Sequence, residues 1–433
     1  MIKKVPLLIL SCITVLVLTG CAAPGTPISI TSIPTSIPAT ATTAPSPTPI
    51  PPTETLTPVP PTATATTPPE NVIQHYPSGQ EFTVTSISMV DANLGWAIGS
   101  LSAQVGDHVL ATTDGGNTWT DVTPPEPQAA ADQHKAAFGY FLDAKTAWVT
   151  YSIGGGNPIP VSPVVWHTAD GGSTWTASQP LDVTGLSEIY VPSDMRFYGQ
   201  QIGWILVHVG VGMNHDYVVI YRSDDGGVTW NRILDPNNDG GIQSCSKNAM
   251  KFTSQTRGWL TGDCNGVKAG VLLYQTNDAG STWQEVTLPG PAGAPDLFSN
   301  QNLACGSYDP FFFGNDWGVL NVRCADFSAA AISYSYYIYS TQDGGATWSG
   351  ASSPGDALYF FTPGTGWALA PKIQMTSDGG KTWKPISDVS WTGQFDFISE
   401  TVGWSIATSG NEMALVKTDN GGARWSMLVP TVK

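Results

Sequence analysis

The chain has 433 residues, with 34 acidic and 18 basic side chains and a formal net charge of −16. Only 12% of its residues are charged, while Gly, Pro and Trp are plentiful, a composition that favours many short strands and turns. A chain this acidic is a poor partner for nucleic acid or for an anionic lipid surface, so neither is expected as a ligand.

Residues 1–20 have the features of a lipoprotein signal peptide. Lys3 and Lys4 precede the apolar run "VPLLILSCITVLVL", and the run ends in "LTGC", which resembles a bacterial lipobox. In that motif the cysteine, here Cys21, is diacylated and becomes the new N-terminus. We therefore expect an exported protein, held by lipid on the outer side of the cell membrane. The alternative is an ordinary signal peptide that happens to be followed by Cys21.

Residues 21–70 are predicted to form a disordered, Pro/Thr-rich tether. Positions 22–70 contain 14 Pro and 14 Thr, no aromatic residue, and only Glu54 and Glu70 as charges. Such a segment cannot bury a core, so we expect an extended and semi-rigid linker.

Residues 71–433 carry a repeated motif. Each of its copies has a hydroxyl residue, then Asp or Asn two positions later, Gly two positions after that, and Trp three beyond the Gly. The copies read TTDGGNTW from Thr112, TADGGSTW from Thr168, SDDGGVTW from Ser223, TNDAGSTW from Thr276, TQDGGATW from Thr341, TSDGGKTW from Thr376 and TDNGGARW from Thr418.

The acidic position of this motif is predicted to close a hairpin turn. Its carboxylate or amide oxygen can accept hydrogen bonds from backbone N–H groups further along the turn. The constant Gly, such as Gly116, is expected to have a positive φ, whereas Ala279 indicates that the position before it does not need Gly. Seven acids spread around a ring cannot serve one active site, so we expect a structural role for Asp114, Asp170, Asp225, Asp278, Asp343, Asp378 and Asn420.

A second Trp precedes each motif. These residues are Trp96, Trp148, Trp204, Trp259, Trp317, Trp367 and Trp404. Each repeat then reads as four short strands, A to D, with the first Trp on strand B and the turn between strands C and D. Seven such units predict an all-β fold, a seven-bladed β-propeller of four-stranded antiparallel blades over residues 71–433.

The repeats resemble Asp-boxes, also called bacterial neuraminidase repeats. The paired "GW" and "T-x-D-G-G-x-T-W" pattern is most similar to the photosystem II assembly and stability factor-like propellers, over about residues 80–430. The resemblance implies a propeller but no single function, because Asp-box propellers include sialidases, xyloglucanases, sorting receptors and assembly factors.

The enzyme classes in this group fit the sequence poorly. Sialidases use an Arg triad and an Arg-Ile-Pro motif, and this chain has six Arg and no Arg-Ile-Pro. A xyloglucanase-like enzyme would place opposed carboxylates between two propellers, and only one propeller is expected here. The assembly factors are associated with a basic Arg patch, from which this acidic chain departs.

We therefore expect a non-enzymatic binding or scaffold module for a protein or glycan, with a role in assembling membrane complexes as one option. The protein is expected to be monomeric, without a cofactor or metal. The alternative function is a carbohydrate-active glycoside hydrolase with catalytic carboxylates on the variable end of the propeller.

The variable end is defined by the B–C and D–A connections, which are longest in repeats 2 to 5. Its length variation is typical either of a binding surface or of drift, since loops tolerate insertion. Two cysteine pairs map to this end, with partners 19 positions apart, and predict the bridges Cys245–Cys264 and Cys305–Cys324. A four-Cys zinc site is the rival, but it lacks C-x-x-C spacing.

The binding residues are predicted on these connections, because inner strands are expected to be buried and without chemistry. The candidates are Asn157, His215, Asp216, Asp235, Asp239, Tyr308, Asp309 and Asp326. The segment from Asp235 to Gly240 resembles the first half of a calcium loop, but Ser246 stands where the closing acid should be, and a plain turn is the favoured interpretation.

Overall fold

The computed structural model describes residues 71–433, apart from 102–105, 129–133, 155–158, 160, 187–188, 213–214, 238–241, 265–269, 301, 329–330, 356 and 370–371. The predicted signal peptide, Cys21 and the tether lie outside the described residues. Within the part that is described, no helix is long and apolar enough to span a membrane.

The described chain is almost entirely β-structure, with one short 3-10 turn, η1, at Leu297–Ser299. Consecutive strands pair mainly as antiparallel hairpins. In chain order the strands are β1 (Thr83–Met89), β2 (Gly95–Ser100), β3 (His108–Thr112), β4 (Thr118–Asp121), β5 (Ala137–Phe141), β6 (Ala147–Tyr151), β7 (Val165–Thr168), β8 (Thr176–Ala177), β9 (Val191–Tyr198), β10 (Ile202–Gly212), β11 (His215–Ser223), β12 (Asn231–Leu234), β13 (Ser246–Phe252), β14 (Gly258–Asp263), β15 (Leu272–Thr276), β16 (Gln284–Glu285), β17 (Leu303–Ser307), β18 (Phe311–Phe313), β19 (Trp317–Asp326), β20 (Ser333–Thr341), β21 (Ser349–Ser352), β22 (Ala357–Phe360), β23 (Gly366–Leu369), β24 (Lys372–Thr376), β25 (Lys384–Asp388), β26 (Thr392–Phe397), β27 (Gly403–Ser409), β28 (Glu412–Thr418), β29 (Ser426–Leu428) and β30 (Thr431–Val432).

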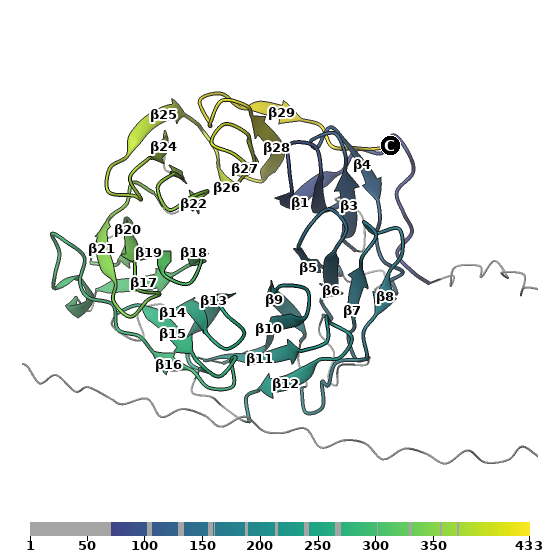
Figure 1. The fold of residues 1–433 in the computed structure, drawn as a ribbon, viewed down its shortest axis with the longest axis horizontal. Coiled ribbons are helices and arrows are strands. Elements are labelled where there is room, and N and C mark those ends of the chain that lie inside the picture. Colours follow the sequence, from purple (N-terminus) through teal and green to yellow (C-terminus); the bar gives the residue numbers. More distant parts are fainter. Residues whose placement is uncertain are drawn as a thin grey trace, which may run out of the picture. The chain divides into compact units, whose positions relative to one another are not determined.

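The strands form several four-stranded antiparallel sheets. These are β5–β8, β9–β12, β22–β25 and β26–β29, while β1–β4 carries β30 as a fifth strand. The strands β13–β16 and β17–β21 join into one nine-stranded sheet through the pair Asp263 and Gly306. In Figure 1 the sheets lie side by side around a common centre, with β1, β5, β9, β13, β18, β22 and β26 innermost. The prediction of an all-β fold with four-stranded antiparallel sheets is confirmed, and the arrangement is propeller-like.

The repeated turn has most of its hydrogen bonds in common from one repeat to the next. In the first copy, Asp114 Oδ1 accepts from the backbone N–H groups of Asn117 and Thr118, at 3.1 and 2.9 Å. The Thr118 hydroxyl donates to Asp114 Oδ2 at 2.6 Å, and Thr112 Oγ1 accepts from Gly116 N at 3.0 Å. In the fifth copy, the hydrogen bonds from Thr347 lower the pKa of Asp343 to about 2. The acid of the turn is therefore fully engaged by its own hairpin.

The residue before the constant Gly also has a left-handed backbone, even where it is Ala. Ala279 has a φ of 65°, close to the 75° of Gly115 at the same position of the first repeat, so this position needs the left-handed conformation that Gly adopts most easily. In several repeats the carbonyl of this residue accepts the indole N–H of the preceding repeat. Trp204 Nε1 donates to Ala279 O at 2.8 Å, and Trp148 Nε1 donates to Gly226 O at 2.7 Å. The turn conformation and the packing of adjacent repeats are thus linked.

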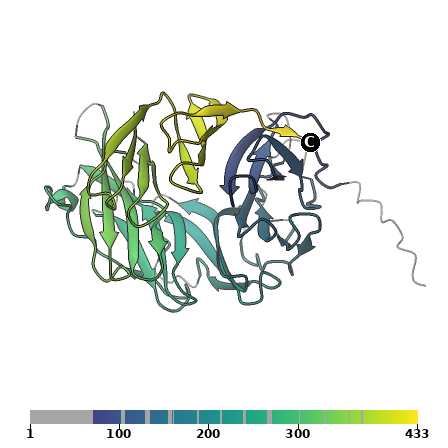
Figure 2. The same ribbon diagram turned by 45° about the horizontal axis from the view of Figure 1, so that its top comes forward.

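The last repeat packs on the first by the same contact. Trp404 Nε1 donates to Gly115 O at 3.0 Å. The C-terminal strand β30 pairs in parallel with β4, and Figure 2 shows this yellow strand beside the blue strands of the first sheet. Buried side chains from both ends of the chain, including Trp119 and Leu415, share one core cluster with Trp404.

Both predicted disulfides are present. Cys245 is bonded to Cys264 and Cys305 to Cys324. The second bridge joins residues that are directly paired on β17 and β19. Two structural disulfides are consistent with an oxidising, extracellular location.

Candidate functional site

A cavity of about 1200 Å³ lies among the innermost strands. Most of its wall comes from the last three repeats, with contributions from β9 and β13. It is lined by Ile87, Arg196, Asn248, Tyr308, Asp309, Phe311, Asn321, Arg323, Tyr336, Ala357, Leu358, Tyr359, Leu369, Val389, Ser390, Trp391, Thr392, Gly393, Gln394, Phe395 and Asp396.

A break in the inner strand of the fifth repeat brings two predicted residues to this cavity. Strand β17 ends at Ser307 and β18 begins at Phe311, so Tyr308 and Asp309 lie in the gap between them. Tyr308 N still donates to Asn321 O at 3.0 Å. Pro310 has no N–H, so the ladder cannot run through the gap unbroken.

An arginine and two carboxylates lie beside this break. Arg196 on β9 lies between two carboxylates, with Nε 3.1 Å from Asp194 Oδ1 and Nη2 3.5 Å from Asp309 Oδ2. Asp194 is buried and accepts a hydrogen bond from Met250 N, and burial raises its pKa although Arg196 is adjacent. The side chain of Asp309 is 60% exposed. Asp309 is therefore the carboxylate of this group that a ligand can reach.

A second carboxyl reaches the cavity from the last repeat. Asp396 on β26 lines the wall, and its Oδ2 accepts a hydrogen bond from Met89 N at 2.6 Å. Burial raises the pKa of Asp396 to about 6, against the lowering effect of that hydrogen bond. A carboxyl with this pKa holds a proton in mildly acidic solution, as a general acid requires.

The rest of the lining combines aromatic rings with uncharged polar groups. Trp391 and Phe395 pack against Trp425 from behind, which fixes the position of both rings. The side chains of Asn248 and Gln394 add amides to the wall. Aromatic surface with a few placed polar groups is typical of a ligand pocket.

The predicted binding residues are spread over several places. Asp216 is buried, with its carboxylate 2.7 Å from His208 Nδ1, and it accepts from Lys247 N at 2.9 Å, so it holds two connections together. Asp235 pairs with Arg232 at 2.8 Å. His215 begins β11 and Asp326 ends β19, and neither lines the cavity. Of the six candidates that the structure describes, Tyr308 and Asp309 line the cavity.

Two candidates cannot be placed. Asn157 and Asp239 lie outside the described residues, and so does Gly240 of the calcium-loop pattern. In the portion of the chain that is described, no group of three or more His, Cys, Asp or Glu is positioned to hold a metal ion.

The expectation that inner strands are fully buried does not hold at this cavity, where charged residues from two of them line the wall. Asp194, Arg196 and Asp396 all lie on innermost strands, β9 and β26. The signal was present in the sequence, as charged residues within the otherwise apolar segments "SDMRFY" and "QFDF". It was missed because inner strands of a propeller pack on their neighbours, whereas here part of their surface faces a cavity.

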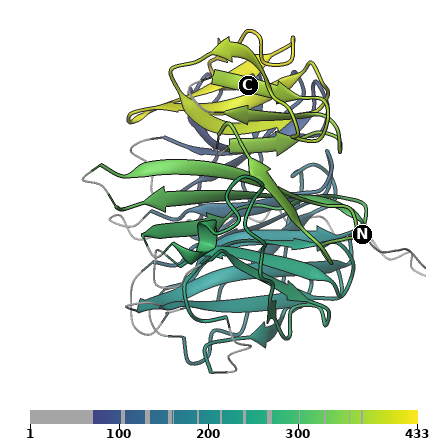
Figure 3. The same cartoon turned by 90° about the vertical axis from the view of Figure 1, so that its left-hand side faces the viewer.

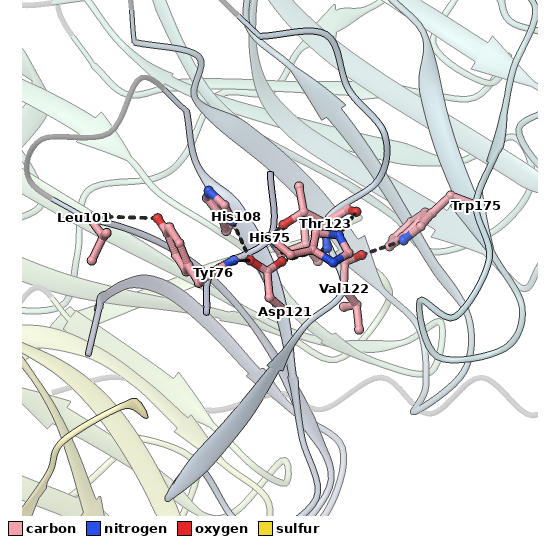
Figure 4. Close-up of polar contacts among 9 residues, drawn as sticks. His75, Tyr76, Leu101, His108, Asp121, Val122, Thr123 and Trp175 are labelled. Carbon is pink, nitrogen blue, oxygen red and sulfur yellow. Dashed lines mark hydrogen bonds and ion pairs between the residues drawn. The ribbon is translucent and has the colours of Figure 1, made fainter. Parts of the chain in front are cut away.

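A second polar cluster lies away from the cavity, on the first sheet (Figure 4). Asp121 Oδ2 is 2.6 Å from His108 Nδ1 and accepts from Tyr76 N at 2.8 Å, while its Oδ1 accepts from the Thr123 hydroxyl at 2.5 Å. Burial acts to raise the pKa of Asp121, but these hydrogen bonds outweigh it and leave the pKa below its ordinary value. With both carboxylate oxygens occupied, the cluster fastens the segment before β1 to the first sheet.

Comparison with known proteins gives one informative match. No family model matches the chain. A xyloglucanase from Paenibacillus sp is 29% identical over 132 residues, which are 30% of this chain and 12% of the xyloglucanase. The chain thus spans only a small part of the curated relative that it matches.

Solved structures give weaker similarities. A GH74 enzyme from Niastella koreensis has a TM-score of 0.35 at 13% identity, over 81% of this chain and 62% of that one. A lectin from Aleuria aurantia has a TM-score of 0.39 at 10% identity, over 82% of this chain and 97% of the lectin. Scores this low carry no argument about function.

The match to the xyloglucanase contradicts the expectation of a non-enzymatic binding or scaffold module. It favours the alternative, a carbohydrate-active glycoside hydrolase. Two carboxyls from different repeats, Asp309 and Asp396, line the same cavity.

Proposed function

We propose that this protein is a carbohydrate-active glycoside hydrolase that binds a glycan in the cavity among its innermost strands. The observation that carries the proposal is Asp396, a carboxyl on the cavity wall with a pKa raised to about 6 by burial. The partial identity to a xyloglucanase supports the substrate class.

The two carboxyls that line the cavity take different roles in this proposal. Asp396 is the general acid and gives its proton to the oxygen of the glycosidic bond as the bond to the anomeric carbon breaks. Asp309 is the carboxylate that attacks the anomeric carbon or takes a proton from the attacking water. Arg196, 3.5 Å from Asp309, orients that carboxylate and stabilises its charge.

The test is cleavage of xyloglucan at about pH 5, measured by the appearance of new reducing ends. Wild-type protein is expected to release them, and Asp309→Asn is expected to lower the rate at least about 100-fold, since loss of one catalytic carboxyl commonly costs this much. Asp296→Asn is the matched control, because Asp296 is exposed and makes no capping hydrogen bond to η1. Equal rates for wild type and Asp309→Asn would remove Asp309 from the mechanism.

We further infer that the scaffold is a single seven-bladed propeller built from Asp-box repeats. The turn bonds that recur in the seven copies of the motif support this count, and the contact of Trp404 with Gly115 supports the packing of the last repeat on the first. The resemblance to photosystem II assembly and stability factor-like propellers stays a prediction about the repeats rather than about the activity.

We propose that residues 1–70 export and tether this enzyme, with lipid on Cys21. Cys21→Ser is expected to release the protein into the medium or leave its signal peptide uncleaved, because the acyl chains that hold it would be absent. Fractionation of membranes and medium, with mass measurement of the N-terminus, checks this. Processing and membrane attachment like those of wild type would contradict the lipobox.

A further inference from the structure

The fifth repeat rises above the sixth at one side of the cavity. In the fifth repeat, β19 and β20 stay paired from Gly318 with Thr341 to Asp326 with Ser333. In the sixth, the equivalent pairing begins at Gly366 with Thr376 and ends at Leu369 with Ile373. The difference can be followed in Figure 3, where the hairpin of β19 and β20 is green and the sixth repeat is yellow-green.

This difference in length leaves one face of the tall hairpin without a neighbouring blade. On β20, Tyr336 and Tyr334 lie five and seven residues before Thr341, the first residue of the turn motif. On β24, the equivalent strand of the sixth repeat, the first residue is Lys372, only four residues before Thr376. Both tyrosines point to the same face, since side chains alternate along a strand. Tyr336 lines the cavity, and Tyr334 is 52% exposed beyond it.

Arg323 connects the cavity to this exposed face. Its guanidinium lies over the ring of Tyr308, 5.1 Å from the centroid, and over the ring of Tyr334, 5.6 Å from the centroid. Tyr308 adjoins Asp309 inside the cavity. The three side chains therefore form a continuous row that begins next to the proposed catalytic carboxylate and ends above the short sixth repeat.

We propose that Tyr308, Arg323 and Tyr334 form a platform for a neutral glycan chain that leaves the cavity over the sixth repeat. Tyr334 stacks on a sugar ring outside the cavity, and Arg323 donates hydrogen bonds to its hydroxyls. The platform rests on the proposed function, because it takes the cavity as the place where the chain is cut. With this platform the enzyme binds a long polysaccharide rather than only short oligosaccharides.

The charges around the cavity favour a neutral glycan. Arg196 in the cavity is already held by Asp194 and Asp309, so it offers little to an anionic sugar. The protein as a whole carries a net charge of −16, which repels a polyanion. Amide side chains in the cavity, Asn248 and Gln394, suit sugar hydroxyls.

The test measures binding apart from cleavage, by affinity electrophoresis of the full chain in gels that contain xyloglucan. Tyr334→Ala is expected to weaken binding about tenfold, as loss of one well-placed aromatic contact does. Tyr334→Phe is expected to bind like wild type, because it keeps the ring. Tyr198→Ala is the matched control. Tyr198 is 42% exposed and is the last residue of β9, at the end of the sheets opposite to Tyr334.

Three results would overturn the platform. They are unchanged binding by Tyr334→Ala, equal weakening by Tyr198→Ala, and no binding of xyloglucan by wild type. Reducing ends measured in parallel separate the two proposals. Binding that depends on Tyr334 without any cleavage would uphold Tyr334 as a glycan-binding residue and reject the hydrolase, whereas cleavage that is indifferent to Tyr334 would uphold the hydrolase and reject the platform.

Discussion

Asp396→Asn is expected to raise the free energy of unfolding at pH 7 by about 3 kcal/mol, because burial of the ionised carboxylate destabilises the native protein. The pKa of Asp396 is raised to about 6 in the folded chain, from an ordinary value of 3.8. The folded state therefore binds its proton more tightly than the unfolded state, and stability is lost as pH rises from about 4 through 6. Asn removes the charge and keeps an oxygen for the Met89 N–H.

The measurement is urea unfolding of wild type and Asp396→Asn at pH 7 and at pH 4. The gain should be present at pH 7 and should shrink strongly at pH 4, where the carboxyl is mostly protonated in the folded state and increasingly so in the unfolded chain. Asp296→Asn removes an exposed charge and should change little at either pH. A variant that is less stable than wild type at pH 7 would show that Asp396 is a structural anchor. A carboxyl kept at a cost in stability is typical of a functional site.

Trp404→Ala is expected to lower the free energy of unfolding by about 3–5 kcal/mol, the usual loss for an aromatic side chain removed from a core. Trp404 is fully buried in the cluster that contains side chains from both ends of the chain. Its indole also donates the hydrogen bond to Gly115 O that joins the last repeat to the first.

Trp404→Phe separates the two contributions. It keeps most of the ring volume and loses the hydrogen bond, so a loss of about 1–2 kcal/mol is expected. Urea unfolding of both variants checks the order. A loss below about 1 kcal/mol for Trp404→Ala would mean that the first and last repeats do not stabilise each other.

The scaffold could be predicted from sequence because each of its parts is local and repeated. A turn such as "TTDGGNTW" closes on itself through Asp114, and seven copies fix where strands begin and end. The disulfides could be predicted from the same strand assignment, because Cys305 and Cys324 occupy facing positions on adjacent strands. The left-handed backbone of Ala279 was not foreseen, although six of the seven copies have Gly at this position, and its carbonyl accepts an indole N–H from another repeat.

The candidate site could be predicted only in part. Tyr308 and Asp309 were found because they lie in a long connection, but Arg196 and Asp396 lie on strands expected to be inert. Arg196 and Asp396 come from repeats about 200 residues apart, and only the curvature of the whole assembly brings both to one cavity wall. The raised pKa of Asp396 depends on burial, which composition and spacing do not show.

The most direct measurement is the rate of xyloglucan cleavage as a function of pH, for wild type and for Asp396→Asn. If Asp396 is the general acid, wild-type activity should fall as pH rises above about 6, because the carboxyl then loses the proton that it must donate. Asp396→Asn should be at least about 100-fold slower at pH 5 while remaining folded and still able to bind the polymer. Wild-type protein that cleaves no glycosidic bond between pH 4 and pH 8, or a variant that cleaves as fast as wild type, would contradict a glycoside hydrolase with its acid at Asp396.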